Sequence, residues 1–155
     1  MHREVVVVLP SIRSTHNTGS FFRTSDAFGV SKIFLCGFTA KPPHPHLLKV
    51  SLGAEESVPW EYVEEPREVV SRLRAEGFQL VGVEQVQQSV ALRDVRWQEK
   101  VALFFGHEVD GLAQEIIDLM DVCAEIPMKG KKESLNVSVI GGIVIYTASL
   151  THDMI

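Results

Sequence analysis

Two uninterrupted apolar runs, residues 5–9 (VVVVL) and 101–105 (VALFF), most constrain the fold of this chain. A strand with one face in water alternates apolar and polar residues, whereas a strand buried on both faces does not. Both runs therefore predict inner strands of a parallel sheet that is covered on both faces. The expected strands are residues 4–9, 32–36, 79–83, 101–105 and 122–126, with a shorter candidate at 58–63.

Helix-like segments alternate with these strands. Strands that alternate with helices are typical of an α/β fold with a mostly parallel sheet and helices on both faces. At 155 residues, the chain has the size of a single domain, 1–155. The last helix is apolar nearly all round, which predicts that it is buried. The expected helices run from an N-cap at Asn17 to Gly29, from Pro66 to Gly77, and over 112–120 and 137–150.

Composition excludes several classes of protein. The longest apolar stretches are too short for a signal peptide or a membrane span, so we expect a cytoplasmic protein without a membrane partner. The two cysteines, Cys36 and Cys123, lie far apart in apolar runs and predict buried, reduced thiols. His44 and His46 lack further ligands, so we expect no metal. The net charge of −5 argues mildly against a large nucleic-acid footprint, although basic residues recur near the glycine-bearing loops.

Three segments could carry chemistry, and each also has a structural interpretation. The first segment, HNTGSFFRTSDAFG (16–29), follows the first strand. In it, Asn17 is either an N-cap or a site residue, and Arg23 is either a solvated charge or a phosphate ligand. LFFGHEVDGL (103–112) brings Glu108 to the end of a buried strand, as a cap or as a site residue. In IPMKGKKESLNVS (126–138), Ser134 and Asn136 are either N-caps or ligands of a small molecule.

Several motifs are missing from the sequence. It contains no GxGxxG after a strand, no GxxxxGK[ST] and no GxSxG, which excludes the usual dinucleotide, P-loop and nucleophile-elbow sites. HEVDG does not complete the zinc motif HExxH, because Gly111 stands where the second histidine is needed. The long loop at 37–46, with three prolines, is either a substrate lid or an ordered surface connection.

Taken together, the three segments resemble the motifs of the SpoU (TrmH-like) family of SPOUT RNA 2′-O-methyltransferases, in the family's order. The resemblance covers nearly the whole chain, from about Val5 to Leu150. It implies a parallel α/β sheet with a C-terminal deep trefoil knot, S-adenosylmethionine as cofactor, a homodimer and an RNA substrate. By position, it implies cofactor contacts at Gly106, Ile126, Met128, Ser134 and Leu135, and catalytic roles for Asn17, Arg23, Glu108 and Asn136.

The implied reaction is S-adenosylmethionine-dependent methylation of a ribose 2′-hydroxyl in structured RNA. A guanidinium keeps its proton at any ordinary pH, so our hypothesis is that Arg23 clamps the phosphate beside the target ribose. In a homodimer, Arg23 would act together with a cofactor that the other subunit holds. Glu108, Asn17 and Asn136 would then hold the loops in shape. Because the chain begins at the first strand, it resembles the short tRNA-modifying members, which favours tRNA over rRNA.

The sequence departs from the family at His107, where asparagine is common; this matters little if the residue serves mainly through its backbone. Two other functions remain open. One is a non-catalytic RNA-binding or cofactor-binding module of the same fold, against which the intact polar set argues. The other is a methyltransferase that acts on a protein or a small molecule, which the acidic balance favours slightly.

Overall fold

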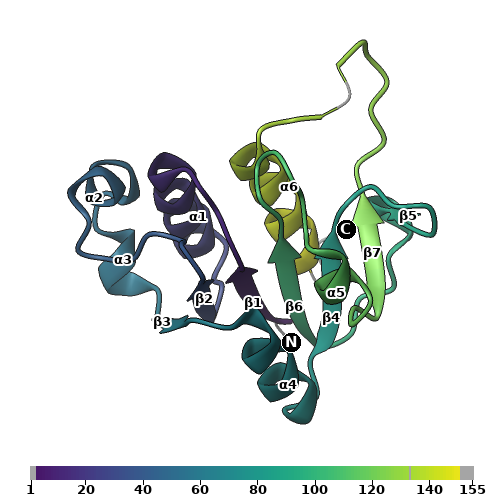
Figure 1. Cartoon of the computed structure of the whole chain (residues 1–155), viewed down its shortest axis with the longest axis horizontal. Helices are drawn as coiled ribbons and strands as arrows, with labels where there is room; N and C mark the ends of the chain where they lie inside the picture. The colour runs from purple at the N-terminus through teal and green to yellow at the C-terminus, as the bar shows by residue number, and fades with distance from the viewer. Residues whose placement is uncertain (1–2, 133, 151–155) are drawn as a thin grey trace.

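The computed structural model describes residues 3–132 and 134–150, and a parallel sheet forms the centre of this part of the chain (Figure 1). Seven strands pair side by side in the order β3-β2-β1-β6-β4-β7-β5, and each pair is parallel. The predicted α/β architecture with a mostly parallel sheet is thereby confirmed. The strands are β1 (Glu4–Leu9), β2 (Lys32–Cys36), β3 (Trp60–Val63), β4 (Gln79–Val83), β5 (Val90–Ala91), β6 (Lys100–Phe105) and β7 (Val122–Glu125).

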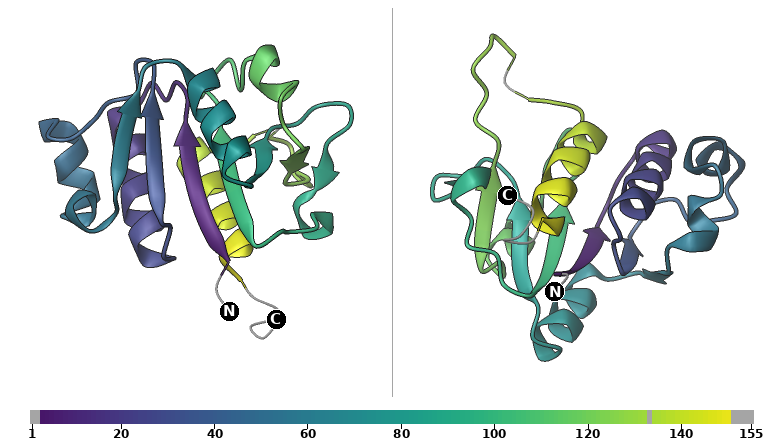
Figure 2. Two further views of the ribbon diagram at one scale, coloured as in Figure 1. Left: turned by 90° about the horizontal axis from the view of Figure 1, so that it is seen from below. Right: turned by 180° about the vertical axis from the view of Figure 1, so that it is seen from behind.

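The helices cover both faces of this sheet (Figure 2). Successive side chains of a strand point to opposite faces, so β1 contributes Val5, Val7 and Leu9 to one apolar core and Val6 and Val8 to another. The first core is completed by α1 and α6, and the second by α4 and α5. The helices are α1 (Thr15–Ala27), α2 (Pro45–Ser51), α3 (Ala54–Ser57), α4 (Pro66–Ala75), α5 (Gln114–Ile117) and α6 (Val137–Ser149), with a 3₁₀ turn at Leu92–Asp94.

The N-cap of α1 is Ser14, so the prediction that Asn17 caps this helix is wrong. The Ser14 hydroxyl accepts a hydrogen bond from the Asn17 backbone N–H at 3.1 Å. Asn17 is the third residue of the helix, where its own side chain is nearly buried. Both residue types cap helices well, and the extended backbone of Ser14 decides between them. At the other end, the helix stops before Gly29, which has φ +72° as expected for a residue that terminates a helix.

The helix expected over 112–120 is much shorter in the structure. Its helical part, α5, covers Gln114–Ile117, and i→i−3 hydrogen bonds carry the chain on to Met120. The helix starts only after Ala113, whose backbone is not helical (ψ 142°), so Leu112 lies before it. Helices α2 and α3 and the two-residue strand β5 were not predicted. For α2 the sequence held a signal, since Pro45 occupies the first turn after the capping side chain of His44.

The prediction that the last helix is buried all round is wrong on one side. Val144, Ile145 and Ala148 are buried against the sheet, whereas Val139, Ile143 and Tyr146 are 49%, 40% and 48% exposed. The exposed side chains lie next to Phe28 at the end of α1, whose ring centre is 5.2 Å from that of Tyr146. We call Phe28, Val139, Ile143 and Tyr146 the α6 outer face. The sheet thus covers only one side of this apolar helix.

Two further expectations stay predictions of the sequence, namely the single domain over 1–155 and the C-terminal trefoil knot. Both cysteines are buried and free, as expected. Burial and the negative charge of Glu65 raise the pKa of Cys36 to about 12, and burial also raises that of Cys123. No helix in the described residues is long and apolar enough to cross a membrane.

Candidate functional site

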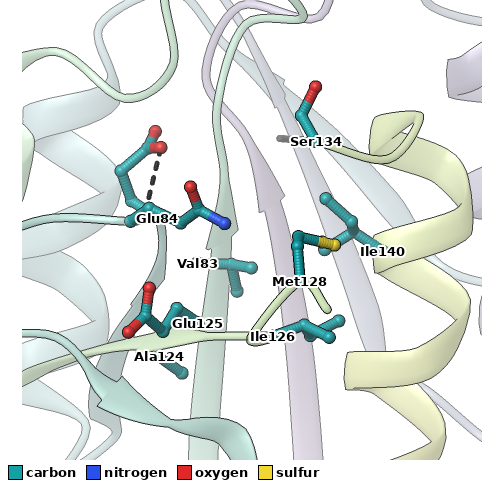
Figure 3. A pocket seen from close by; sticks show the side chains of 9 residues that line it. Val83, Glu84, Ala124, Glu125, Ile126, Met128, Ser134 and Ile140 are labelled. Atoms are coloured by element: carbon teal, nitrogen blue, oxygen red, sulfur yellow. Dashed lines mark hydrogen bonds between the residues drawn. The ribbon is translucent and has the colours of Figure 1, made fainter. Parts of the chain in front are cut away.

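Two adjoining cavities lie at the carboxyl edge of the sheet, where β4, β6 and β7 end. The larger has a volume of about 490 Å³ and the smaller about 110 Å³. They share the lining residues Val83, Glu84, Ser134 and Ile140, so one extended ligand could occupy both. Figure 3 shows the smaller cavity between the end of β4, the segment after β7 and the first turns of α6. Carboxyl edges of parallel sheets are where α/β proteins bind their ligands.

The predicted cofactor-binding residues all line these cavities. Gly106 and Leu135 line the larger one, Ile126 and Met128 line the smaller one, and Ser134 lines both. They come from the end of β6 and from the irregular stretches 126–132 and 134–136 between β7 and α6 (Figure 1). The structure thus brings residues together that are up to 29 positions apart in the chain (106 and 135). That they contact a cofactor stays a prediction.

The lining suits a ligand with an apolar ring and several polar groups. Val83, Ile126 and Ile140 supply apolar surface, and Ser134 and Glu84 supply polar groups beside it. At Gly106 the backbone itself forms the wall, because a Cβ atom there would lie 2.4 Å from the backbone of Gly111 and Leu112. A side chain at this position would therefore push the loop 106–112 out of place.

The loop 106–112 is a tight turn with extensive internal hydrogen bonding. His107 and Gly111 exchange two backbone hydrogen bonds, of 3.1 and 2.9 Å. The Nδ1 atom of His107 also accepts hydrogen bonds from the backbone N–H groups of Val109 (3.0 Å) and Asp110 (3.1 Å). The expectation that His107 serves mainly through its backbone is thus incomplete. Its imidazole makes the local side-chain-to-backbone bonds that an asparagine carbonyl makes in a turn, which accounts for histidine at this position.

Glu84 holds the far end of this loop and was missed by the sequence reasoning. Its Oε2 atom accepts a hydrogen bond from the backbone N–H of Leu112 at 2.9 Å. The space for the carboxylate exists because Gly111 has no side chain; a Cβ atom there would lie 2.3 Å from Oε2. The available signal was an acidic residue directly after the predicted strand 79–83, at the edge where ligands bind.

Two of the predicted catalytic residues line the larger cavity, and both order the backbone beside it. The Glu108 carboxylate accepts hydrogen bonds from the backbone N–H groups of Arg13 (2.9 Å) and Ser14 (2.7 Å), and thereby ties the loop 106–112 to the start of α1. Asn136 is the N-cap of α6, and its Oδ1 atom accepts from the backbone N–H of Ser138 at 2.8 Å. The capping interpretation of Asn136 is therefore confirmed, whereas Ser134 precedes the cap and does not start the helix.

The other two predicted catalytic residues, Asn17 and Arg23, lie on α1 and line neither cavity. Asn17 is only 5% exposed, and Arg23 is exposed on the surface of the helix. The neighbour of Arg23, Thr24, contributes to a hollow of about 520 Å³ over the α6 outer face. The structure therefore places Glu108 and Asn136 at the larger cavity and leaves Asn17 and Arg23 away from both cavities.

Charged residues of both signs lie around the cavities. Glu84, Glu108, Asp110 and Glu125 line them, and Lys129, Lys131 and Lys132 are exposed on the chain after β7. These lysines are the groups near this edge that would attract an anionic partner, although the whole chain carries a net charge of −5. Among the residues that the structure places, no group of three or more His, Cys, Asp or Glu side chains could hold a metal ion.

Comparison with known proteins identifies the same family as the three sequence motifs. The model of the SpoU rRNA Methylase family matches residues 4–146. A tRNA (guanosine(18)-2'-O)-methyltransferase of Aquifex aeolicus (strain VF5) is 31% identical over 147 residues, which cover 94% of this chain and 69% of that protein. The AdoMet-bound rRNA methyltransferase from Sinorhizobium meliloti superposes with a TM-score of 0.89 at 30% identity, over 96% of this chain and 56% of that one.

A third similar structure has nearly the length of this chain. It is described as giving structural insights into the 2-OH methylation of C/U34 on tRNA, and it superposes with a TM-score of 0.83 at 25% identity over 94% of both chains. The chain belongs to the SpoU rRNA methylase family. The predicted family, and with it the class of RNA methyltransferases, is thereby confirmed.

Proposed function

We propose that this protein transfers a methyl group from S-adenosylmethionine to a ribose 2′-hydroxyl of an RNA. The observation that carries the proposal is the pair of adjoining cavities at the carboxyl edge of the sheet, lined by the residues that the family motifs select. S-adenosylmethionine supplies an electrophilic methyl group on a sulfonium sulfur. Val83, Ile126 and Ile140 would hold its apolar part, and the backbone at Gly106 allows a close approach.

The residues of this chain contribute mainly by positioning the acceptor. When two reactants are held in line, a bimolecular transfer becomes effectively unimolecular, and this supplies much of the acceleration. Arg23 binds the phosphate beside the target ribose with its planar fork and so orients the 2′-hydroxyl. A guanidinium carries five N–H donors and no acceptor, so Arg23 does not take the hydroxyl proton itself. Glu108 and Asn136 keep the cavity wall and the start of α6 in place.

We propose tRNA as the substrate. In support, the Aquifex relative acts on tRNA by name, and so does the structural neighbour that matches this chain over nearly its whole length. The test is incubation of the protein with labelled S-adenosylmethionine and either total tRNA or rRNA, followed by digestion and mass spectrometry of the nucleosides. We expect 2′-O-methylated nucleosides from tRNA. Label on a base would overturn the reaction, label on rRNA alone would overturn the substrate, and cofactor binding without transfer to any RNA would indicate a non-catalytic module.

We also propose that the protein works as a homodimer through the α6 outer face. Apolar side chains gathered on one surface, such as Ile143 and Tyr146, typically mark an interface. Arg23, next to Thr24 at the rim of this surface, lines neither cavity of its own chain and would complete the site of the partner. Ile143→Glu should convert a dimer into a monomer in light scattering, whereas Leu52→Glu, at an apolar residue 68% exposed elsewhere, should leave it unchanged. A monomeric wild type would overturn this arrangement.

Subunit mixing tests the shared site directly. Arg23→Ala and Gly106→Val each inactivate one half of every site, the first on the acceptor side and the second on the cofactor side. When both variants are unfolded and refolded together, about half of the dimers should be mixed, and each of these has one intact site. The mixture should therefore recover about a quarter of wild-type activity. No recovery in a mixture shown to contain mixed dimers would mean that Arg23 serves its own chain.

A further inference from the structure

We propose that Glu84 binds the sugar of the methyl donor, with its carboxylate accepting hydrogen bonds from the two ribose hydroxyls. This proposal rests on the proposed function, because it assigns a residue to a donor that the cavities would hold. It adds a polar contact to a site in which the family motifs supply mostly backbone and apolar surface.

Glu84 directly follows β4 and lines both cavities. Its backbone N–H donates to the carbonyl of Ala124 at 3.1 Å, which continues the pairing of β4 with β7 and fixes the main chain at this point. A ligand that extends from the smaller into the larger cavity must pass its side chain. In a bound nucleoside, the sugar is the part between the base and the remaining chain, so it is the part that reaches such a junction.

The Glu84 carboxylate is held in one orientation and keeps free acceptor capacity. Oε2 accepts from the backbone N–H of Leu112 at 2.9 Å, and Oε1 accepts from that of Gln85 at 3.2 Å. Each carboxylate oxygen has two lone pairs, so both atoms can accept one more hydrogen bond. The side chain is half-buried and forms no salt bridge with any residue that the structure describes.

A carboxylate that forms no salt bridge and keeps free lone pairs can accept hydrogen bonds from a pair of neutral O–H groups. The vicinal hydroxyls of a ribose offer two O–H groups on adjacent carbons, which match the two oxygens of a carboxylate. Other parallel α/β proteins use an acidic residue in this way for the ribose of a dinucleotide. Glu125 also lines the smaller cavity but does not reach the larger one. It therefore provides a matched control at the same edge of the sheet.

The test is titration calorimetry with S-adenosylhomocysteine and its 2′-deoxy and 3′-deoxy analogues. Wild-type protein should bind each deoxy analogue about 10- to 100-fold more weakly, as expected for the loss of a hydrogen bond to a charged acceptor. In Glu84→Ala, the affinity for S-adenosylhomocysteine should fall by a similar factor, and the difference between the ribose and deoxy compounds should disappear. Glu125→Gln should keep the wild-type difference.

A second variant separates sugar binding from support of the loop. Glu84→Gln keeps one carbonyl oxygen for the Leu112 N–H, so the loop 106–112 should stay ordered. The amide can accept a hydrogen bond from only one ribose hydroxyl. The loss of affinity on removal of a hydroxyl should therefore persist for only one of the two deoxy analogues. If Glu84→Ala weakens the ribose and deoxy compounds equally, Glu84 only holds the loop and the proposal is wrong. A much larger loss for S-adenosylmethionine than for S-adenosylhomocysteine would instead assign the carboxylate to the sulfonium. If the wild type binds neither compound, the proposed function fails first, and this proposal with it.

Discussion

Glu108 joins the wall of the larger cavity to the helix that carries Asn17 and Arg23, and its removal should be measurable as a loss of stability. Its two carboxylate oxygens accept from the backbone N–H groups of Arg13 and Ser14, at 2.9 and 2.7 Å. Ser14 is the N-cap of α1, so the negative charge also lies beside the positive end of this helix. Glu108→Ala removes both hydrogen bonds and this charge.

The size of the effect follows from these contacts. The groups are exposed, so water replaces each lost bond in part, and each contributes about 1 kcal/mol. The charge at the start of α1 adds about 0.3–1 kcal/mol. We therefore expect Glu108→Ala to lower the free energy of unfolding by about 2–3 kcal/mol, which corresponds to a fall in Tm of about 4–12 °C for a chain of this size. Glu108→Gln keeps one acceptor oxygen and should lose about half as much.

Urea denaturation of the three proteins measures these differences, with Glu115→Ala as the control. The Glu115 carboxylate meets only the Arg67 guanidinium, at 3.8 Å, and its side chain is 59% exposed, so its loss should change stability by less than about 0.5 kcal/mol. If Glu108→Ala is no less stable than Glu115→Ala, Glu108 does not tie the loop to α1. Equal losses in the alanine and glutamine variants would show that the charge, and not the pair of bonds, is responsible.

Further predictions concern the acceptor side, the turn and the acid stability. Arg23→Lys keeps the charge without the planar fork, so methyl transfer should fall at least about tenfold with unchanged cofactor affinity; wild-type turnover would contradict the phosphate clamp. His107→Asn should retain the stability measured in urea, while His107→Ala should lose about 1 kcal/mol with the two N–H acceptor contacts. Hydrogen bonds from Arg72 and Lys32 lower the pKa of Glu61 from 4.5 to about 2. Their stabilisation is thus present above pH 4.5 and lost as the pH falls toward 2. With the Glu61 side chain 36% exposed, we expect about 1 kcal/mol, and Glu61→Gln should flatten this part of the stability curve.

The sequence predicted the sheet well because its inner strands must be apolar on both faces. The expected strands 4–9, 32–36 and 79–83 match β1, β2 and β4 residue for residue. Strand β5 has two residues, too few for any periodicity, and it pairs only at the edge of the sheet with β7. The exposed side of α6 was mispredicted for a different reason: an apolar helix face indicates that something covers it, but periodicity does not tell whether the same chain does.

The site was predictable to the extent that it consists of contiguous motifs. Gly106 and Leu135, at which the resemblance implies cofactor contacts, both line the larger cavity, and each belongs to a motif that the sequence shows directly. Glu84 belongs to no motif, and its role depends on the space left by Gly111, which is 27 positions away in the chain (84 and 111). The imidazole of His107 was missed because its partners are the backbone N–H groups of its own turn. Contacts of these kinds become visible only when the chain is folded.

The loop 106–112 is fastened at both ends by carboxylates that belong to different parts of the site. Glu84 binds the N–H of Leu112 from the side of the cavities, and Glu108, within the loop, binds the N–H of Ser14 at the start of α1. A ligand that contacts Glu84 therefore acts on the same rigid turn that positions the helix of Arg23. The turn is closed by the two backbone hydrogen bonds between His107 and Gly111, which hold the attachment points of Glu84 and Glu108 close together. The turn thus contributes more than a wall of the larger cavity, because its hydrogen bonds connect this wall to the helix that carries Arg23.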